Sequence, residues 1–148
     1  KISKKDFKKC HPSGNLGAKR RTLEEIMITG NKIPFVNGNL IMKKALQIIS
    51  NKKLGILVVR NNKGITTGVI TDGQIRRFNQ VNDNLQSLTV KEVMTLNPIS
   101  IDKDTLVEKA LSIMNSKKIT SLCVHSKKNL KRTVGILHIH KILETNIN

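Results

Sequence analysis

Thr71 and Asp72 lie where a short apolar stretch meets a sequence typical of an amphipathic helix. The stretch reads Gly68-Val-Ile-Thr-Asp-Gly73, and Ile75 and Phe78 follow at helical spacing. Threonine and aspartate both favour the N-cap of a helix. A helix start presents free backbone N–H groups and the positive end of the helix dipole, which together attract an anion such as phosphate. We predict that Thr71 offers its hydroxyl to a ligand, or that it only caps the helix.

A degraded copy of this junction occurs near the C-terminus as Gly135-Ile-Leu-His-Ile-His140. His138 takes the place of Thr71, and two copies of one unit suggest a two-sided site between them. The two histidines suggest a metal by composition, but no third ligand is evident at a suitable spacing, so we expect no metal and no cofactor. We expect His138 to face the ligand cleft and His140 to face the surface.

Two further polar positions, His11 and Thr120, are candidate site residues, and the two cysteines are not. His11 is suited to proton transfer near neutral pH, although a lone histidine in a polar leader is usually solvent-exposed and idle. Thr120 interrupts an apolar strand, where it either contacts a ligand or is solvated at a turn. Cys10 has no oxyanion-hole motif beside it and indicates an idle surface thiol, whereas Cys123 replaces an apolar strand residue and indicates core.

The composition bounds the class of protein. A chain of 148 residues with 38% hydrophobic residues fits one domain, or two very small ones sharing a core. No apolar run approaches the roughly 18 residues of a membrane span, and the N-terminus lacks the apolar stretch of a signal peptide. The two cysteines suggest no disulfide framework, so we predict a cytoplasmic protein. The chain lacks an initiator Met, which suggests a piece of a longer protein.

The net charge of +17 requires an explanation. Such a charge can mark a nucleic-acid binder. The lysines, however, are scattered as pairs over the whole chain, and aromatic residues among the basic ones are missing. This pattern favours a solvated basic surface over a nucleic-acid site.

The chain repeats itself after a basic leader at residues 1–21. Thr22-Leu-Glu-Glu25 and Thr89-Val-Lys-Glu92 both read as capping boxes that open a short helix. Asn39 and Asp104 are then predicted as N-caps of a longer helix. These helices carry similar apolar stripes, which are Ile41, Ala45, Ile48 and Ile49 in the first copy and Leu106, Ala110, Ile113 and Met114 in the second.

Strands and a last helix complete each copy. We predict strands at 54–60 and 66–70 in the first copy and at 119–125 and 133–137 in the second. The last helices are predicted at 72–79 and 139–146. The repeats therefore span 22–79 and 89–146, joined by a polar linker at 80–88. We predict an α+β fold in which the two copies pack sheet to sheet about a pseudo-twofold axis, with ligand clefts at the strand ends between them.

This order of elements, with Val-Met-Thr at 93–95 and Gly68-x-x-Thr71, resembles a CBS-domain pair, the Bateman module. The resemblance covers residues 23–145. It implies a module that binds adenosine nucleotides or related ligands and regulates an attached enzyme or transporter. The family's Gly-x-x-Thr-x-x-Asp motif ends here in Gln74, and the second copy ends in Lys141, so the usual ribose-binding carboxylates are replaced.

The leader extends the resemblance. Asp6 to Gly17, with His11-Pro-Ser-Gly14-Asn-Leu-Gly, resembles the loop that leaves the sugar-isomerase (SIS) domain of bacterial D-arabinose 5-phosphate isomerases. The family's pattern there is His-Pro-Gly-Gly-x-Leu-Gly, so Ser13 replaces a glycine. The words Thr71-Asp72-Gly73, Lys118-Ile-Thr120 and Leu137-His-Ile-His140 also agree with that family.

The resemblance implies a parent aldose–ketose isomerase that converts D-ribulose 5-phosphate to D-arabinose 5-phosphate, the first step toward the lipopolysaccharide sugar Kdo. It also implies that His11 is the active-site histidine of the parent, while a fragment without the SIS domain is not catalytic by itself. We predict a nucleotide or nucleotide-sugar ligand, such as CMP-Kdo, near Thr71, Asp72, Pro98, Thr120 and His138.

Three hypotheses remain open at this level. The pair is either a ligand sensor or a purely structural module, and in both cases a homo-oligomer is expected because such pairs stack through their helical faces. The third hypothesis is a stand-alone protein that binds nucleic acid through its positive charge.

Overall fold

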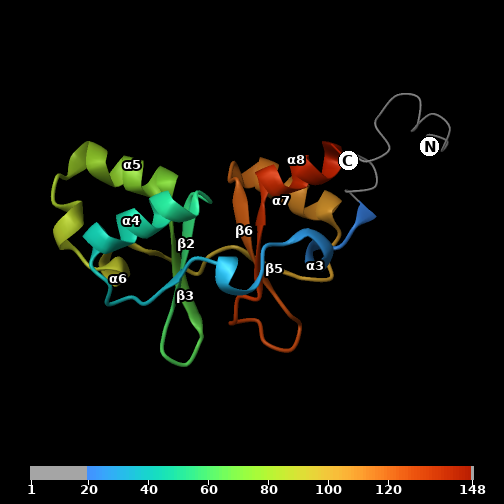
Figure 1. Ribbon diagram of the computed structural model, residues 1–148, viewed down its shortest axis with the longest axis horizontal. Coiled ribbons are helices and arrows are strands. Elements are labelled where there is room, and N and C mark those ends of the chain that lie inside the picture. Colours follow the sequence, from blue (N-terminus) through green and yellow to red (C-terminus); the bar gives the residue numbers. More distant parts are fainter. Residues whose placement is uncertain (1–19, 148) are drawn as a thin grey trace. The chain divides into compact units, whose positions relative to one another are not determined.

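The structure is a computed structural model that describes residues 20–147 in two compact units (Figure 1). Unit 1 holds the described residues up to Ile28, together with Ser100–Leu130 and Val134 onward. Unit 2 holds Thr29–Ile99 and Lys131–Thr133.

Unit 2 is built on a four-stranded sheet with the order β1-β2-β3-β4. β1 is parallel to β2, and the other neighbours are antiparallel. The strands are β1 (Phe35–Val36), β2 (Ile56–Arg60), β3 (Thr66–Thr71) and β4 (Thr95–Leu96). The helices are η1 (Gly30–Lys32), α4 (Met42–Lys52), α5 (Asp72–Val81), η2 (Leu85–Ser87) and α6 (Val90–Val93). Leu57 and Ile70 of the sheet form one buried core with Met42, Ala45 and Ile49 of α4.

Unit 1 repeats this plan with a three-stranded sheet in the order β5-β6-β7. Its strands are β5 (Ser100–Asp102), β6 (Ser121–His125) and β7 (Gly135–His138). Its helices are α3 (Leu23–Ile26), α7 (Val107–Lys117) and α8 (Ile139–Ile147). Leu122, Leu137 and Ile142 form its core with Val107 and Met114 of α7. The predicted α+β fold with two repeats is confirmed, and the mutual packing of the two sheets stays a prediction.

The start of α4 differs from the prediction. Asn39 is not its N-cap, because Ile41 stays extended and α4 begins at Met42. The Met42 N–H donates to the Leu88 carbonyl at 2.7 Å, so a backbone oxygen replaces a capping side chain. The buried stripe accordingly begins at Met42, while Ile41 is 40% exposed.

The start of α7 shows the same correction. Asp104 is not the N-cap, since Leu106 is extended and α7 begins at Val107. The Val107 N–H donates to the Arg21 carbonyl at 2.8 Å. Val107 is fully buried and Leu106 is 46% exposed, so the buried stripe begins one residue later here too, while Ala110 and Met114 are buried as predicted. In both cases the longer helix starts where a distant segment supplies the first hydrogen-bond acceptor.

Both predicted capping boxes are present. The Thr22 N–H donates to Glu25 Oε1 at 2.8 Å, and the Thr89 N–H donates to Glu92 Oε1 at 2.9 Å. Hydrogen bonds from the Thr89 backbone N–H and hydroxyl hold the pKa of the Glu92 carboxyl below its ordinary value.

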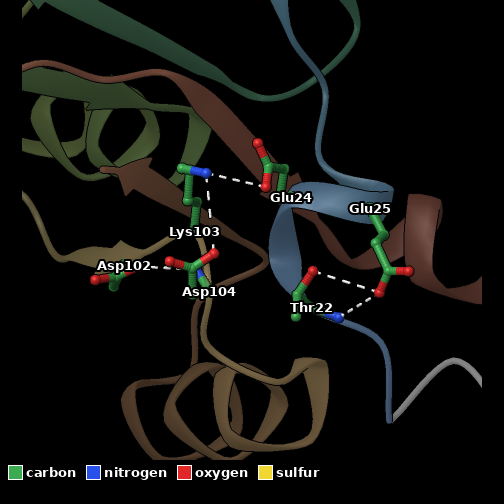
Figure 2. A network of polar contacts seen from close by, with 6 residues as sticks. All are labelled: Thr22, Glu24, Glu25, Asp102, Lys103 and Asp104. Atoms are coloured by element: carbon green, nitrogen blue, oxygen red, sulfur yellow. Dashed lines mark hydrogen bonds and ion pairs between the residues drawn. The ribbon is translucent and has the colours of Figure 1, made fainter. Parts of the chain in front are cut away.

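A polar network fixes α3 beside the loop between β5 and α7 (Figure 2). Lys103 Nζ lies 3.0 Å from Glu24 Oε1 and 3.9 Å from Asp104 Oδ1. The hydrogen bond to Glu24 raises the pKa of the Lys103 ammonium. The Glu24 N–H also donates to the Lys103 carbonyl at 2.9 Å, so backbone and side chain join the same two residues.

The two compact units do not follow the sequence repeats at their opening helices. α3 precedes the first repeat's strands but belongs to unit 1, and α6 precedes the second repeat's strands but belongs to unit 2. Ile28, just after α3, exchanges two backbone hydrogen bonds with Ile136 of β7 at 2.8 and 2.9 Å. β4, just after α6, pairs with β3. Neither pairing is evident from the repeat pattern.

Gly68 and Gly135 permit these crossings. A Cβ at Gly68 would lie 2.6 Å from the Thr95 carbonyl oxygen and 2.8 Å from Met94 Sδ. A Cβ at Gly135 would lie 2.7 Å from Met27 Cγ and 3.1 Å from the Ile28 carbonyl oxygen. The glycine that opens each motif is therefore needed because a Met-containing segment passes directly over its strand.

We predict that Gly68→Ala lowers the free energy of unfolding by about 1–3 kcal/mol, because the methyl group would overlap a backbone carbonyl that cannot rotate away. Gly135→Ala should act in the same direction. Urea unfolding followed by circular dichroism measures both. Gly73→Ala is the matched control, since its nearest neighbour is the flexible end of Arg77 and α5 gains up to ~1 kcal/mol of helix propensity. Equal losses in all three variants would contradict the steric explanation.

We also predict a pH-dependent contribution from Glu92. A carboxyl with a lowered pKa stabilises the folded state above its unfolded pKa, and that contribution is lost as the pH falls through the folded pKa. The difference in stability between the wild type and Glu92→Gln should therefore shrink below about pH 4. Thermal melts from pH 7 downward measure it, and a difference that stays constant across the range would refute this account.

Candidate ligand-binding site

Thr71 ends β3 and caps α5 in unit 2. Its Oγ1 accepts a hydrogen bond from the Gln74 N–H at 3.2 Å. The prediction that Thr71 caps the helix is thus confirmed. The hydroxyl hydrogen is still free to donate to a ligand oxygen, because a threonine hydroxyl carries one donor and two acceptor lone pairs. Thr71 is half-buried, so its hydroxyl lies within reach of the surface.

Asp72 changes the chemistry expected at this turn. Its N–H donates to the Gly55 carbonyl at 3.0 Å, so two of the first three helical N–H groups are already bonded within the protein. The exposed Asp72 carboxylate stands at the same helix start and would repel a second anion. Gly55 has a φ of +69° and brings its backbone against that carboxylate. The Asp72 carboxylate can accept hydrogen bonds from ligand hydroxyls, while the guanidinium groups of Arg76 and Arg77 lie close to Gly73 at the same turn.

Gln74 occupies the position of the replaced motif carboxylate. Its Nε2 donates to the Val93 carbonyl, the last residue of α6, so the side chain ties α5 to α6 within unit 2. Its Oε1 is buried without a hydrogen-bond partner in the described part of the chain. The side chain has therefore become a structural link, a role that the motif comparison alone does not reveal.

His138 holds the corresponding place in unit 1. It ends β7 and is 6% exposed, while His140 is exposed at the surface as predicted. His138 Nδ1 accepts a hydrogen bond from the His140 N–H at 3.1 Å, and the two rings stack with centroids 5.0 Å apart. The imidazole thus caps α8 as the Thr71 hydroxyl caps α5. Because Nδ1 is an acceptor, the neutral ring carries its proton on Nε2.

Thr120 lies at the same sheet edge as His138. Its carbonyl accepts the Ile139 N–H at 2.9 Å, and the next residue, Ser121, pairs with His138. Thr120 is exposed and lines a hollow of about 630 Å³ between α7 and the start of α8. The hollow is lined by Glu108, Leu111, Ser112, Met114, Asn115, Lys118, Ile119, Thr120 and Ile139.

The polar residues of α7 at this hollow were not predicted. Glu108, Ser112 and Asn115 recur at helical spacing on one face of α7. Their helical spacing in the segment that precedes Thr120 is the sequence signal that could have identified them. Apolar residues interleave with them, so the stripe reads as ordinary amphipathicity until the fold is known.

The remaining predicted residues fall elsewhere. Pro98 is half-buried in unit 2, between β4 and β5, and follows Asn97, whose φ is +53°. His11 lies outside the described residues. The structure thus places Thr71 beside Asp72 in unit 2 and Thr120 near His138 in unit 1. A joint site of all five ligand residues stays a prediction.

Residues 20–147 were also compared with the requirements of a metal site, a reactive cysteine and a membrane span. No three His, Cys, Asp or Glu residues lie together in a way that could hold a metal ion. Cys123 is buried in β6, in line with its assignment to the core. No helix in the described part of the chain is both long enough and apolar enough to cross a membrane.

Each unit contains a βαββα order of elements, and a comparison of the sequence with known protein families identifies the same repeat. The CBS domain model matches residues 23–80 and 90–147. The chain therefore belongs to the CBS domain family, as a tandem pair.

Curated relatives extend the likeness beyond the fold. The chain is 35% identical over 143 residues to arabinose 5-phosphate isomerase KdsD of Salmonella typhi, covering 96% of this chain and 43% of that protein. It is 31% identical over 147 residues to the uncharacterized protein RP505 of Rickettsia prowazekii, covering 99% of this chain and 44% of that protein. The chain thus spans less than half the length of these relatives.

Solved structures share the fold at lower identity. The CBS domain pair of protein MJ0100, in complex with 5′-methylthioadenosine and S-adenosyl-L-methionine, matches with a TM-score of 0.72 and 22% identity, over 84% of this chain and 94% of that one. CBSX2 in complex with AMP, a protein of Arabidopsis thaliana, matches with a TM-score of 0.72 and 19% identity, over 85% and 96%.

We predict that Thr71→Val lowers the free energy of unfolding by about 1 kcal/mol, because valine keeps the shape but cannot accept the Gln74 N–H. Thr71→Ser should retain most of the stability. Thermal melts of the three proteins measure the effect. Wild-type stability in the valine variant would show that the cap contributes nothing.

Proposed function

We propose that this chain is the ligand-sensing CBS pair of an arabinose 5-phosphate isomerase. The observation that carries the proposal is the 35% identity to a KdsD enzyme, in an alignment that covers 96% of this chain and 43% of that enzyme. The parent would interconvert D-ribulose 5-phosphate and D-arabinose 5-phosphate on the path to Kdo. In that parent, His11 of the His-Pro leader would belong to the isomerase active site of a SIS domain.

The sensing role rests on the two strand-to-helix turns. Thr71 would donate its hydroxyl hydrogen, and the Asp72 carboxylate would accept hydrogen bonds from ligand hydroxyls. Pro98 would contribute apolar contact in the same unit. In unit 1, His138 and the Thr120 hydroxyl would contribute polar contacts to the ligand. Structural neighbours of this fold hold AMP or S-adenosyl-L-methionine, which supports a nucleoside-containing ligand.

The departures from the family motif bear on the class of ligand. Gln74 is engaged with Val93, so the usual carboxylate contact to ribose is replaced in the first copy. Lys141 occupies the corresponding position of the second copy; it is exposed, lies 4.0 Å from Glu144 Oε1, and would favour an anionic ligand. A nucleotide sugar with an acidic sugar, such as CMP-Kdo, combines hydroxyls for Asp72 with a carboxylate and phosphate for a cation. Feedback by such a product would suit a first enzyme of the path.

A structural role is the second candidate. Leu143 on α8 is 49% exposed, and Val81 at the end of α5 is 79% exposed. These exposed apolar side chains would be available for contact with another copy of the chain. A pair used only for assembly would form a stable oligomer and bind no nucleotide.

We predict saturable binding of at least one of AMP, ATP and CMP-Kdo, measured by titration calorimetry. Thr71→Val combined with Asp72→Asn should weaken that binding by roughly tenfold or more, because two hydrogen-bonding groups are lost. Asp83→Asn is the matched control, since it removes one exposed carboxylate of the same unit outside the turn.

No heat from any of the three ligands would contradict sensing. In that case a dimer by light scattering would support the structural role. Expression of the complete parent reading frame, with and without these residues, tests the other half of the proposal. Isomerase activity on ribulose 5-phosphate supports it, and its absence in a folded parent contradicts it.

A further inference from the structure

A second concave site lies in unit 2, at the opposite end of the sheet from Thr71. The turn between β2 and β3 forms one wall, at the end of the hairpin that points away from α5 (Figure 1). The hollow measures about 530 Å³, within the range of small-molecule sites. It is lined by Phe35, Val36, Asn37, Arg60, Asn61, Asn62, Lys63, Gly64 and Arg132.

Three cationic side chains converge on this hollow from separate segments. Arg60 ends β2, Lys63 lies in the turn, and Arg132 comes from residues 131–133, which dock on unit 2. The lining contains no carboxylate, and no salt bridge reaches these three residues within the part of the chain described. Their combined charge is therefore not neutralised inside the protein.

Arg132 is held in place by the turn itself. Its guanidinium donates to the Lys63 carbonyl, and it lies against Gly64, where a Cβ would collide with the guanidinium. The segment is anchored by the Thr66 N–H, which donates to the Lys131 carbonyl at 2.8 Å, and by a 2.7 Å hydrogen bond between the hydroxyls of Thr66 and Thr133. The remaining guanidinium N–H groups of Arg132 are available to a ligand.

The asparagines make the lining rich in donors. Asn61 Oδ1 accepts from the N–H groups of Lys63 and Ile65 at 2.9 and 3.0 Å. Asn62 Oδ1 accepts from Asn37 Nδ2 at 3.1 Å, and Asn37 Oδ1 accepts from the Asn39 N–H at 2.9 Å. All three amide oxygens are thus used within the protein.

Donors remain unused at the same place. The amide nitrogens of Asn61 and Asn62 donate no hydrogen bond among the described residues. Arg60 stacks 3.7 Å above the Phe35 ring centre, an arrangement that leaves the edge of its guanidinium exposed. A hollow with free N–H donors, unneutralised cations and occupied acceptors matches an oxyanion.

We propose that this hollow, bounded by Arg60, Lys63, Arg132, Asn61 and Asn62, binds the phosphate or diphosphate group of a small metabolite. The concave shape and the scarcity of aromatic residues around it favour a small molecule over a nucleic-acid strand. The site does not depend on the turns at Thr71 and His138, so it goes beyond the sensing role proposed above.

Titration of the chain with inorganic pyrophosphate and with ribose 5-phosphate tests the proposal, and the two probes separate a diphosphate from a phosphate monoester. Lys63→Gln combined with Arg132→Gln should weaken binding by roughly tenfold or more. Lys43→Gln combined with Lys44→Gln is the matched control, because it removes the same charge from the exposed face of α4 in the same unit. The control should bind as the wild type does. Arg132→Lys, which keeps the charge but loses the forked donor, should bind with intermediate affinity.

Several outcomes would overturn the proposal. One is the absence of saturable binding by either probe. Another is an equal loss in the pocket and control variants, which would indicate diffuse attraction to a basic surface. A third is binding of a duplex oligonucleotide that neither probe displaces. Urea unfolding of each variant confirms that it is folded. Because neither probe contains a nucleoside, a failure of these probes to bind does not contradict the proposed nucleotide sensing.

Discussion

The close passage of a methionine-containing segment over a glycine is the constraint on which each unit depends. In unit 2, Met94 and Thr95 cross Gly68, and in unit 1, Met27 and Ile28 cross Gly135. Backbone can approach backbone at this distance only where no Cβ intervenes. The crossing adds β4 to the edge of β3 and joins Ile28 to β7, so it recruits each opening helix into its unit.

The crossings also determine what surrounds the candidate ligand turns. α6 is held next to α5, where Gln74 donates to the Val93 carbonyl. The position that carries a ribose-binding carboxylate in the family's motif is thereby committed to the interior of the unit. Thr71 and Asp72 keep exposed polar groups just before it. The chemistry of the turn therefore follows from the packing of the opening helix as much as from the motif itself.

The two ends of the unit 2 sheet differ in whether a carboxylate accompanies the cationic side chains. Asp72 places a carboxylate at the α5 end, while Arg60, Lys63 and Arg132 gather at the hairpin end. The net charge of +17 and the scattered lysine pairs predict a solvated basic surface. The fold concentrates positive charge at one place, because a turn, a strand end and the segment 131–133 bring three cations to one hollow that has no carboxylate in its lining.

Local patterns in the sequence determined the repeated order of helices and strands, both capping boxes and the cap at Thr71, because these depend on neighbours within a few residues. Tertiary structure decided where α4 and α7 begin, since the first acceptors are the carbonyls of Leu88 and Arg21 rather than the side chains of Asn39 and Asp104. It also decided that Gln74 is a structural link and that Arg132 joins a basic hollow. These outcomes rest on contacts between segments far apart in the chain, which periodicity and spacing do not encode.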